Sequence, residues 1–146
     1  MNQTSLNEQN NQTQIEWLKQ QMNEIKKKNE WNFMLGHHPI YQFSKDGQDL
    51  ASELSNPLNP ILETKKIHAY FAGHQHCLRS FKDNNTIHIV SGAAGNDLFA
   101  PSPHPKETFL SVEPGFVFVQ VKYNIMTIDF YSSFKNESLK QFVIKK

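Results

Sequence analysis

The sequence predicts an α/β fold in which a β-α-β unit is followed by a β-meander. Two apolar runs, residues 31–35 and 67–72, each lead into a glycine-histidine turn, and a helix-forming stretch separates them. Downstream, apolar and polar residues alternate over 116–122 and again over 125–131, on either side of a Tyr-Asn turn. Strands separated by a helical stretch indicate a parallel pair, whereas alternating runs joined by a tight turn indicate an antiparallel pair. The order of elements therefore favours a layered α/β sandwich.

The N-terminal part of the chain is expected to be a disordered segment followed by one amphipathic helix. Residues 1–12 are polar and rich in Asn and Gln, which is typical of disorder. A helix is expected over residues 13–28, because apolar side chains recur there at spacings of three and four. The stripe consists of Ile15, Leu18, Met22 and Ile25. Residues 13–146 are expected to form the folded domain.

Prolines and turn residues set the other expected boundaries. A short helix is expected over residues 47–54, and Pro57 and Pro60 predict a break before a further turn of helix near residues 61–63.

Further along, the runs at 78–82 and 86–91 flank Asp-Asn-Asn, which is the signal of a hairpin. Residues 92–115 contain four prolines and are expected to form a long irregular loop. Residues 140–144 are expected to add an edge strand.

Composition argues against several classes of protein. The 146 residues suffice for one domain with a real core, and the formal charge of +1 argues against nucleic-acid binding. No stretch approaches the roughly 18 apolar residues of a membrane span, and the polar N-terminus lacks the apolar stretch of a signal peptide. The lone Cys77 has no partner for an internal disulfide. A packed thiol is favoured for it over a metal ligand.

The two histidine turns carry the chemistry of the chain. Gly-His-His-Pro at residues 36–39 and Gly-His-Gln-His at residues 73–76 each follow a predicted strand. Binding crevices form at the carboxyl ends of strands in α/β sheets, and neutral imidazole is a common ligand of transition metals. In the second motif the rings of His74 and His76 can diverge from one loop and reach two metals. This pattern predicts a dinuclear hydrolytic site whose carboxylate ligands are missing from the residues around it.

The chain resembles the C-terminal half of a metallophosphoesterase (calcineurin-like) domain, and is most similar to the small purple acid phosphatases, or tartrate-resistant acid phosphatases. Besides the two histidine motifs, the resemblance rests on Gln-Ile-Glu-Trp-Leu at residues 14–18, Ser-Gly-Ala-Ala-Gly-Asn at 91–96 and Gly-Phe-Val-Phe-Val at 115–119. It implies one half of a four-layered α/β/β/α sandwich, and a partial metallophosphoesterase domain over residues 13–146.

The resemblance also implies roles for individual residues. His37 and His74 are similar to ligands of a divalent Zn, Mn or Fe ion, and His76 is similar to a ligand of a redox-capable iron. His38 is expected near the phosphate but off the metal. Where small purple acid phosphatases carry a histidine that assists the leaving group, this chain has Asp46. Both a general acid and a solvated turn residue remain open for Asp46.

The remaining ligands of the family come from three motifs that this sequence lacks, namely Asp-x-His, Gly-Asp-x-x-Asp or Tyr, and Gly-Asn-His. Three imidazoles cannot hold two metals, so we expect the isolated chain to be inactive. The N-terminal half of the domain is the expected partner, in the same gene product or on a neighbouring chain. A truncated gene or an expression fragment is the other explanation.

Two functions therefore follow from the sequence. The first is metal-dependent hydrolysis of a phosphomonoester substrate by the complete, acid-phosphatase-like domain. The second is a non-catalytic role, in which a degenerate phosphatase half serves as an interaction module. The resemblance further implies a secreted, lysosomal or vacuolar location, although the N-terminal residues do not read as a signal peptide.

Overall fold

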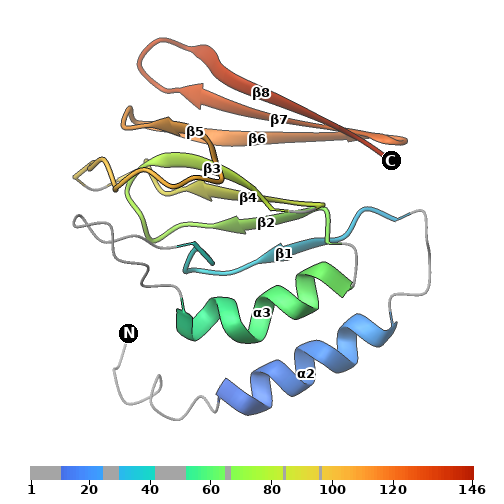
Figure 1. Ribbon diagram of the computed structural model, residues 1–146. Helices are drawn as coiled ribbons and strands as arrows, with labels where there is room; N and C mark the ends of the chain where they lie inside the picture. Colours follow the sequence, from blue (N-terminus) through green and yellow to red (C-terminus); the bar gives the residue numbers. More distant parts are fainter. Residues whose placement is uncertain (1–10, 25–29, 42–51, 65–66, 84, 96) are drawn as a thin grey trace.

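The computed structural model describes residues 11–24, 30–41, 52–64, 67–83, 85–95 and 97–146, which form three layers (Figure 1). The first layer contains the helices α2 (Asn11–Glu24) and α3 (Ser52–Thr64). The second is a five-stranded sheet, in the spatial order β1 (Phe33–Leu35), β2 (Ala69–Ala72), β4 (Thr86–Ser91), β3 (Leu78–Asp83) and β5 (Glu107–Ser111). The third is a three-stranded sheet of β6 (Gly115–Lys122), β7 (Ile125–Ser132) and β8 (Glu137–Lys145).

The pairing of the strands confirms the predicted topology. β1 pairs with β2 in parallel, and β2 pairs with β4 in parallel, so α3 completes a β-α-β unit between β1 and β2. β3 and β4 form the expected antiparallel hairpin. β6, β7 and β8 form the expected antiparallel meander, with β8 longer than the sequence indicated.

Two hydrophobic cores separate the three layers. The core between the helices and the five-stranded sheet includes Met22, Leu62 and Tyr70, and the partly buried Ile15 and Leu18 of α2 pack against it. The predicted apolar stripe of α2 is thus confirmed, except for Ile25, which lies outside the described residues, as do residues 1–10. The helix begins at Asn11, two residues before the predicted start.

The core between the two sheets is built by alternation along the strands. Met126, Ile128 and Phe130 of β7 all have no exposed surface, and they meet Leu78 and Ile89 of the larger sheet. Side chains on one face of a strand recur every second residue, so this face of β7 supplies one wall of the core.

The predicted break at the prolines is wrong. α3 runs without interruption from Ser52 to Thr64 and contains both Pro57 and Pro60. Each proline in a helix interior costs about 3 kcal/mol, whereas burying one large aliphatic side chain stabilises by about 1.5–3 kcal/mol. Leu58, Ile61 and Leu62 are all buried against the sheet, and their burial offsets the missing backbone hydrogen bonds. Residues 47–51 of the expected short helix lie outside the described part of the chain.

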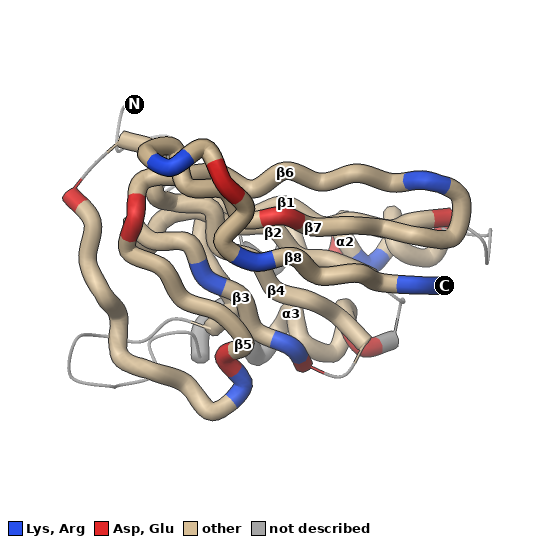
Figure 2. The backbone as a smooth tube through the Cα atoms, turned by 90° about the horizontal axis from the view of Figure 1, so that it is seen from above, with Lys and Arg blue, Asp and Glu red and all other residues tan. Residues whose placement is uncertain are grey.

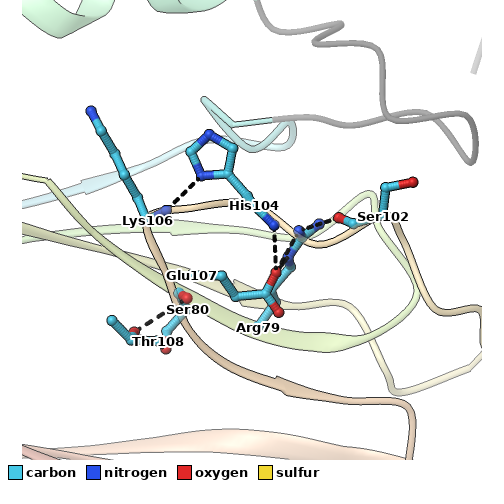
Figure 3. A network of polar contacts seen from close by, with 7 residues as sticks. All are labelled: Arg79, Ser80, Ser102, His104, Lys106, Glu107 and Thr108. Carbon is cyan, nitrogen blue, oxygen red and sulfur yellow. Dashed lines mark hydrogen bonds and ion pairs between the residues drawn. The ribbon is translucent and has the colours of Figure 1, made fainter.

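The predicted irregular loop over residues 92–115 is also wrong, because it contains β5. β5 pairs with β3 in antiparallel fashion, with a bulge between Ser80 and Phe81. The Arg79 side chain is fully buried and forms an ion pair with Glu107 of β5 at 2.7 Å, as Figure 3 shows. Arg79 also donates a hydrogen bond to the Ser102 carbonyl at 2.7 Å. This ion pair and the strand pairing hold the proline-rich segment against the sheet.

Two surfaces of the chain expose apolar side chains. Along β1, at the edge of the larger sheet, Leu35 is 79% exposed. On the outer face of the smaller sheet, Phe116 and Phe118 are each half exposed, and Phe116 stacks on Tyr131. Within the described residues no helix covers this outer face (Figure 1), so three layers of the expected four-layered sandwich are present. No described helix is long and apolar enough to cross a membrane.

Candidate metal centre

The two histidine motifs meet at one edge of the larger sheet. Gly-His-His-Pro follows β1 and Gly-His-Gln-His follows β2, and these strands are parallel neighbours, so both motifs lie at carboxyl ends. The Gly73 N–H donates a hydrogen bond to the His37 carbonyl at 3.1 Å, which ties the two loops together. The edge of the sheet on which they lie is where α/β folds bind their ligands.

Three imidazoles converge at this point. The ring centroids of His37 and His74 are 5.2 Å apart, and those of His38 and His74 are 4.2 Å apart. One ring nitrogen from each of His37, His38 and His74 lies within 4.8 Å of the other two. A single cation with ligands at about 2.0–2.1 Å needs nitrogens at most ~4.2 Å apart, so small side-chain rotations would close the group around one ion.

His38 was expected off the metal, but its ring is nearer to that of His74 than the His37 ring is. The sequence signal for this position is the His-His dipeptide itself, because adjacent residues in a tight turn can point to one side. The group contains no carboxylate from the described part of the chain. Asp46 lies outside the described residues.

The backbone of the second loop holds His74 in an unusual conformation. His74 has a φ angle of 62°, in the left-handed region that residues with a Cβ atom seldom adopt. Such positions concentrate at functional sites, where the surrounding structure over-determines them. Gly92 supports this loop from beneath, because a Cβ atom there would lie 1.9 Å from the Gln75 carbonyl oxygen. The sequence indicated the Ser-Gly-Ala-Ala-Gly-Asn segment only by resemblance, and this close approach gives its first glycine, Gly92, a physical role.

The first loop is fixed by a tyrosine from the neighbouring strand. The Tyr70 hydroxyl donates a hydrogen bond to the His38 carbonyl at 2.8 Å. To reach it, the hydroxyl passes directly over Gly36, where a Cβ atom would lie only 2.2 Å away. Sequence reasoning missed Tyr70, since an apolar run gives no sign that one of its rings reaches a backbone carbonyl.

His76 lies outside the group of three and is oriented by the chain further on. Its Nδ1 atom lies 3.0 Å from the Asp97 carbonyl oxygen. If Nδ1 donates to that carbonyl, the Nε2 atom is left as the ligand atom. A carbonyl or carboxylate on the second ring nitrogen is the usual support of a metal-binding histidine.

Local electrostatics favour the neutral rings that bind metals. Burial and then the charge of His37 lower the pKa of His38. Burial and then the charges of His38 and His37 lower the pKa of His74. By contrast, burial raises the pKa of the Cys77 thiol to about 11, and its side chain has no exposed surface. Cys77 is therefore the packed thiol that the sequence favoured.

Two other histidines pack within the fold, away from the group of three. The His68 Nδ1 atom accepts a hydrogen bond from the Asn32 N–H at 3.1 Å, and its ring meets the edge of Trp31. His88 is buried within β4, between the rings of Tyr41 and Tyr70.

Comparison with known proteins assigns the family. The family model for calcineurin-like phosphoesterases matches residues 1–78. The chain belongs to the calcineurin-like phosphoesterase family. Tartrate-resistant acid phosphatase type 5 of the pig, Sus scrofa, is 32% identical over 92 residues, which are 63% of this chain and 26% of that protein. The human enzyme is 27% identical over 128 residues, which are 81% of this chain and 38% of that protein. This chain thus spans less than two fifths of the length of these relatives.

Solved structures agree with this assignment. GAP50, described as the anchor in the inner membrane complex of Plasmodium, has a TM-score of 0.79 and 26% identity, covering 90% of this chain and 41% of that one. Purple acid phosphatase PPD1 from yellow lupin, Lupinus luteus, has a TM-score of 0.78 and 19% identity, covering 90% and 28%. The similarity to PPD1 concerns the fold alone. The fold and the purple acid phosphatase relatives together imply a dinuclear metal centre, and the three convergent imidazoles with the supported His76 fit the histidine part of one.

Proposed function

We propose that this chain supplies the histidine ligands of a dinuclear centre in an acid-phosphatase-like phosphomonoesterase. The observation that carries the proposal is the convergence of the His37 and His74 ring nitrogens at the carboxyl ends of two parallel strands. In this proposal His37 and His74 hold a divalent Zn, Mn or Fe ion, and His76 holds iron. The carboxylate, Tyr and Asn ligands come from an N-terminal half of the domain, on the same product or on a second chain.

In this proposal each residue of the site has its own chemical role. A pair of cations bound there would supply Lewis-acid chemistry, which polarises a phosphoryl oxygen and lowers the pKa of a water molecule. The left-handed His74 carries its ring beside those of His37 and His38, and the Asp97 carbonyl orients the ring of His76. His38 lies beside the same centre, where its ring can donate to a phosphate oxygen. Asp46 is the proposed counterpart of the family's leaving-group histidine.

The decisive experiment measures hydrolysis of p-nitrophenyl phosphate by this chain joined to a segment that carries the three missing motifs. His74→Ala should abolish turnover, because an under-coordinated ion leaves the site or loses its geometry. His38→Ala should reduce turnover less, and His88→Ala should affect stability alone. Asp46→His should raise turnover on poor leaving groups if protonation limits the rate. Wild-type activity in His74→Ala would overturn the metal assignment.

The isolated chain, without the N-terminal half, provides a second test of the same proposal. With imidazole ligands only, it should bind one cation weakly and should not hydrolyse p-nitrophenyl phosphate with iron and zinc present. Metal-dependent turnover that His76→Ala removes would mean that carboxylates of this chain, such as Asp97, complete the centre.

A second candidate is a non-catalytic interaction module. It is favoured by the similarity to GAP50, an anchor protein with the same fold, and by the exposed aromatic side chains on the outer face of the smaller sheet. In this case the joined protein would remain inactive with iron and zinc although it folds and binds metal. Activity in that protein would exclude the module as its sole function.

A further inference from the structure

A hollow lies at the end of the sandwich opposite the histidines. It has a volume of about 500 Å³ and is lined by the C-terminal end of β8, by the residues just before β2 and by the first residues of β4. The histidine motifs follow the other ends of β1 and β2. The hollow is therefore separate from the metal centre, and its size falls in the range of about 300–1,000 Å³ that small-molecule sites occupy.

The inner walls of the hollow are apolar and come from both sheets. Ile67, just before β2, and Ile87 of β4 are almost fully buried. Phe142 and Ile144 of β8 face them and also pack against the core between the sheets. An apolar chain placed here would extend an existing hydrophobic core, and burial of each of its CH₂ groups would be favourable.

The rim of the hollow is basic. Lys82, Lys145 and Lys146 line it and are exposed, and no Asp or Glu of the described residues lines it. None of these three lysines forms an ion pair with a described carboxylate. Figure 2 shows basic positions at the C-terminal end of β8 and at the turn end of β3. The Lys146 ammonium lies over the Trp31 ring, 4.8 Å from its centroid. Cations without a countercharge at the mouth of an apolar hollow are complementary to a ligand with an anionic head and an apolar tail.

We propose that this hollow binds a free single-chain amphiphile with an anionic head, its tail between the two sheets and its head at the three lysines. The proposal is independent of the phosphatase function, because it uses no residue of the metal centre. Recognition needs both parts of the ligand. The tail alone leaves the ammonium groups without a countercharge, and the head alone buries no apolar surface.

Calorimetric titration of the chain with three probes tests this requirement. Octanoate should bind, whereas acetate, which has the head only, and 1-octanol, which has the chain only, should bind at least about tenfold more weakly. The affinity for octanoate should fall with added salt, since the lysines are exposed. Equal binding of octanoate and 1-octanol would overturn the role of the lysines, and equal binding of acetate would overturn the role of the apolar walls.

Variants locate the site. Lys145→Gln should weaken octanoate binding about threefold, whereas Lys19→Gln, an equal charge change on α2, should leave it unchanged. Ile144→Trp should fill the hollow and abolish binding, with circular dichroism as the check on folding. Equal loss in Lys19→Gln would mean unspecific attraction and would overturn the site. Binding to anionic vesicles without binding of free octanoate would assign the basic rim to a membrane surface and overturn it as well.

Discussion

His74 combines a left-handed backbone with a ring that points into the candidate metal centre. A residue with a Cβ atom in this conformation costs about 1–2 kcal/mol relative to an ordinary one, and glycine relieves that cost. We therefore expect His74→Gly to raise the free energy of unfolding of the metal-free chain by about 1 kcal/mol. The same change should remove Zn²⁺ binding, because it deletes one of three convergent imidazoles.

Urea denaturation and zinc titration measure the two effects separately. The matched control is Tyr123→Gly, at an exposed turn position whose φ of 52° is equally left-handed. It should give a similar gain in stability and leave zinc binding intact. A loss of stability in His74→Gly would show that the ring itself, and not the metal, is what the strained backbone serves.

His88 makes the stability of the chain depend on pH. Burial is the main reason that its pKa falls from 6.5 to about 4, with Asp83 raising the pKa and Lys106 lowering it. The unfolded chain takes up this proton near pH 6.5 and the folded chain only near pH 4. The unfolded state thus binds more protons in this window, and the free energy of unfolding falls as pH is lowered through it.

The expected loss between pH 6.5 and pH 4 is at most about 3 kcal/mol, at about 1.4 kcal/mol for each pKa unit. Thermal denaturation across this range should show a steeper fall for the wild type than for His88→Phe, which keeps an aromatic ring but cannot titrate. Hydrogen bonds from Lys106 and Tyr41 outweigh burial and hold the pKa of Asp83 below its usual range, so its contribution is lost only at still lower pH. Parallel pH profiles of the two proteins would refute the assignment to His88.

At the level of elements, the Arg79–Glu107 ion pair attaches β5 to the larger sheet. Glu107→Gln would leave a fully buried guanidinium without its countercharge, and breaking a buried pair from one side typically costs about 3–5 kcal/mol. Replacing both partners, with Arg79→Met and Glu107→Leu, should recover much of that loss. The control is Lys135→Met, which removes the exposed pair with Glu113 and should change the denaturation midpoint little. A double variant as unstable as the single one would contradict this account.

The elements differ in how far their sequence predicts them. β2, β6 and β7 are apolar or alternating runs between turn residues, and local pattern alone determines them. α3 and β5 are stabilised by distant contacts, through Leu58, Ile61 and Leu62 on the sheet and through Arg79 with Glu107. Proline positions and spacing within a segment carry no information about such contacts. For the same reason the motifs predicted His37 and His74 together, but neither the closeness of His38 nor the Tyr70 support.

At the level of the whole molecule, the larger sheet has an open edge at β1. β1 pairs on one side with β2, and no other described strand pairs with it. Leu35 is 79% exposed and Phe33 is 39% exposed on this strand. An unpaired strand edge with exposed apolar side chains is a template for pairing with another chain.

We expect the purified chain to self-associate through this edge as its concentration rises, and Leu35→Lys to keep it monomeric, because a charge at an edge strand opposes pairing. Sedimentation velocity over a range of concentrations measures this directly. Phe134→Lys is the matched control, since Phe134 is equally exposed, at 78%, but lies in the turn between β7 and β8. Addition of an N-terminal half that pairs with β1 should suppress the self-association of the wild type. Association that Phe134→Lys removes and Leu35→Lys does not would place the contact on the smaller sheet instead.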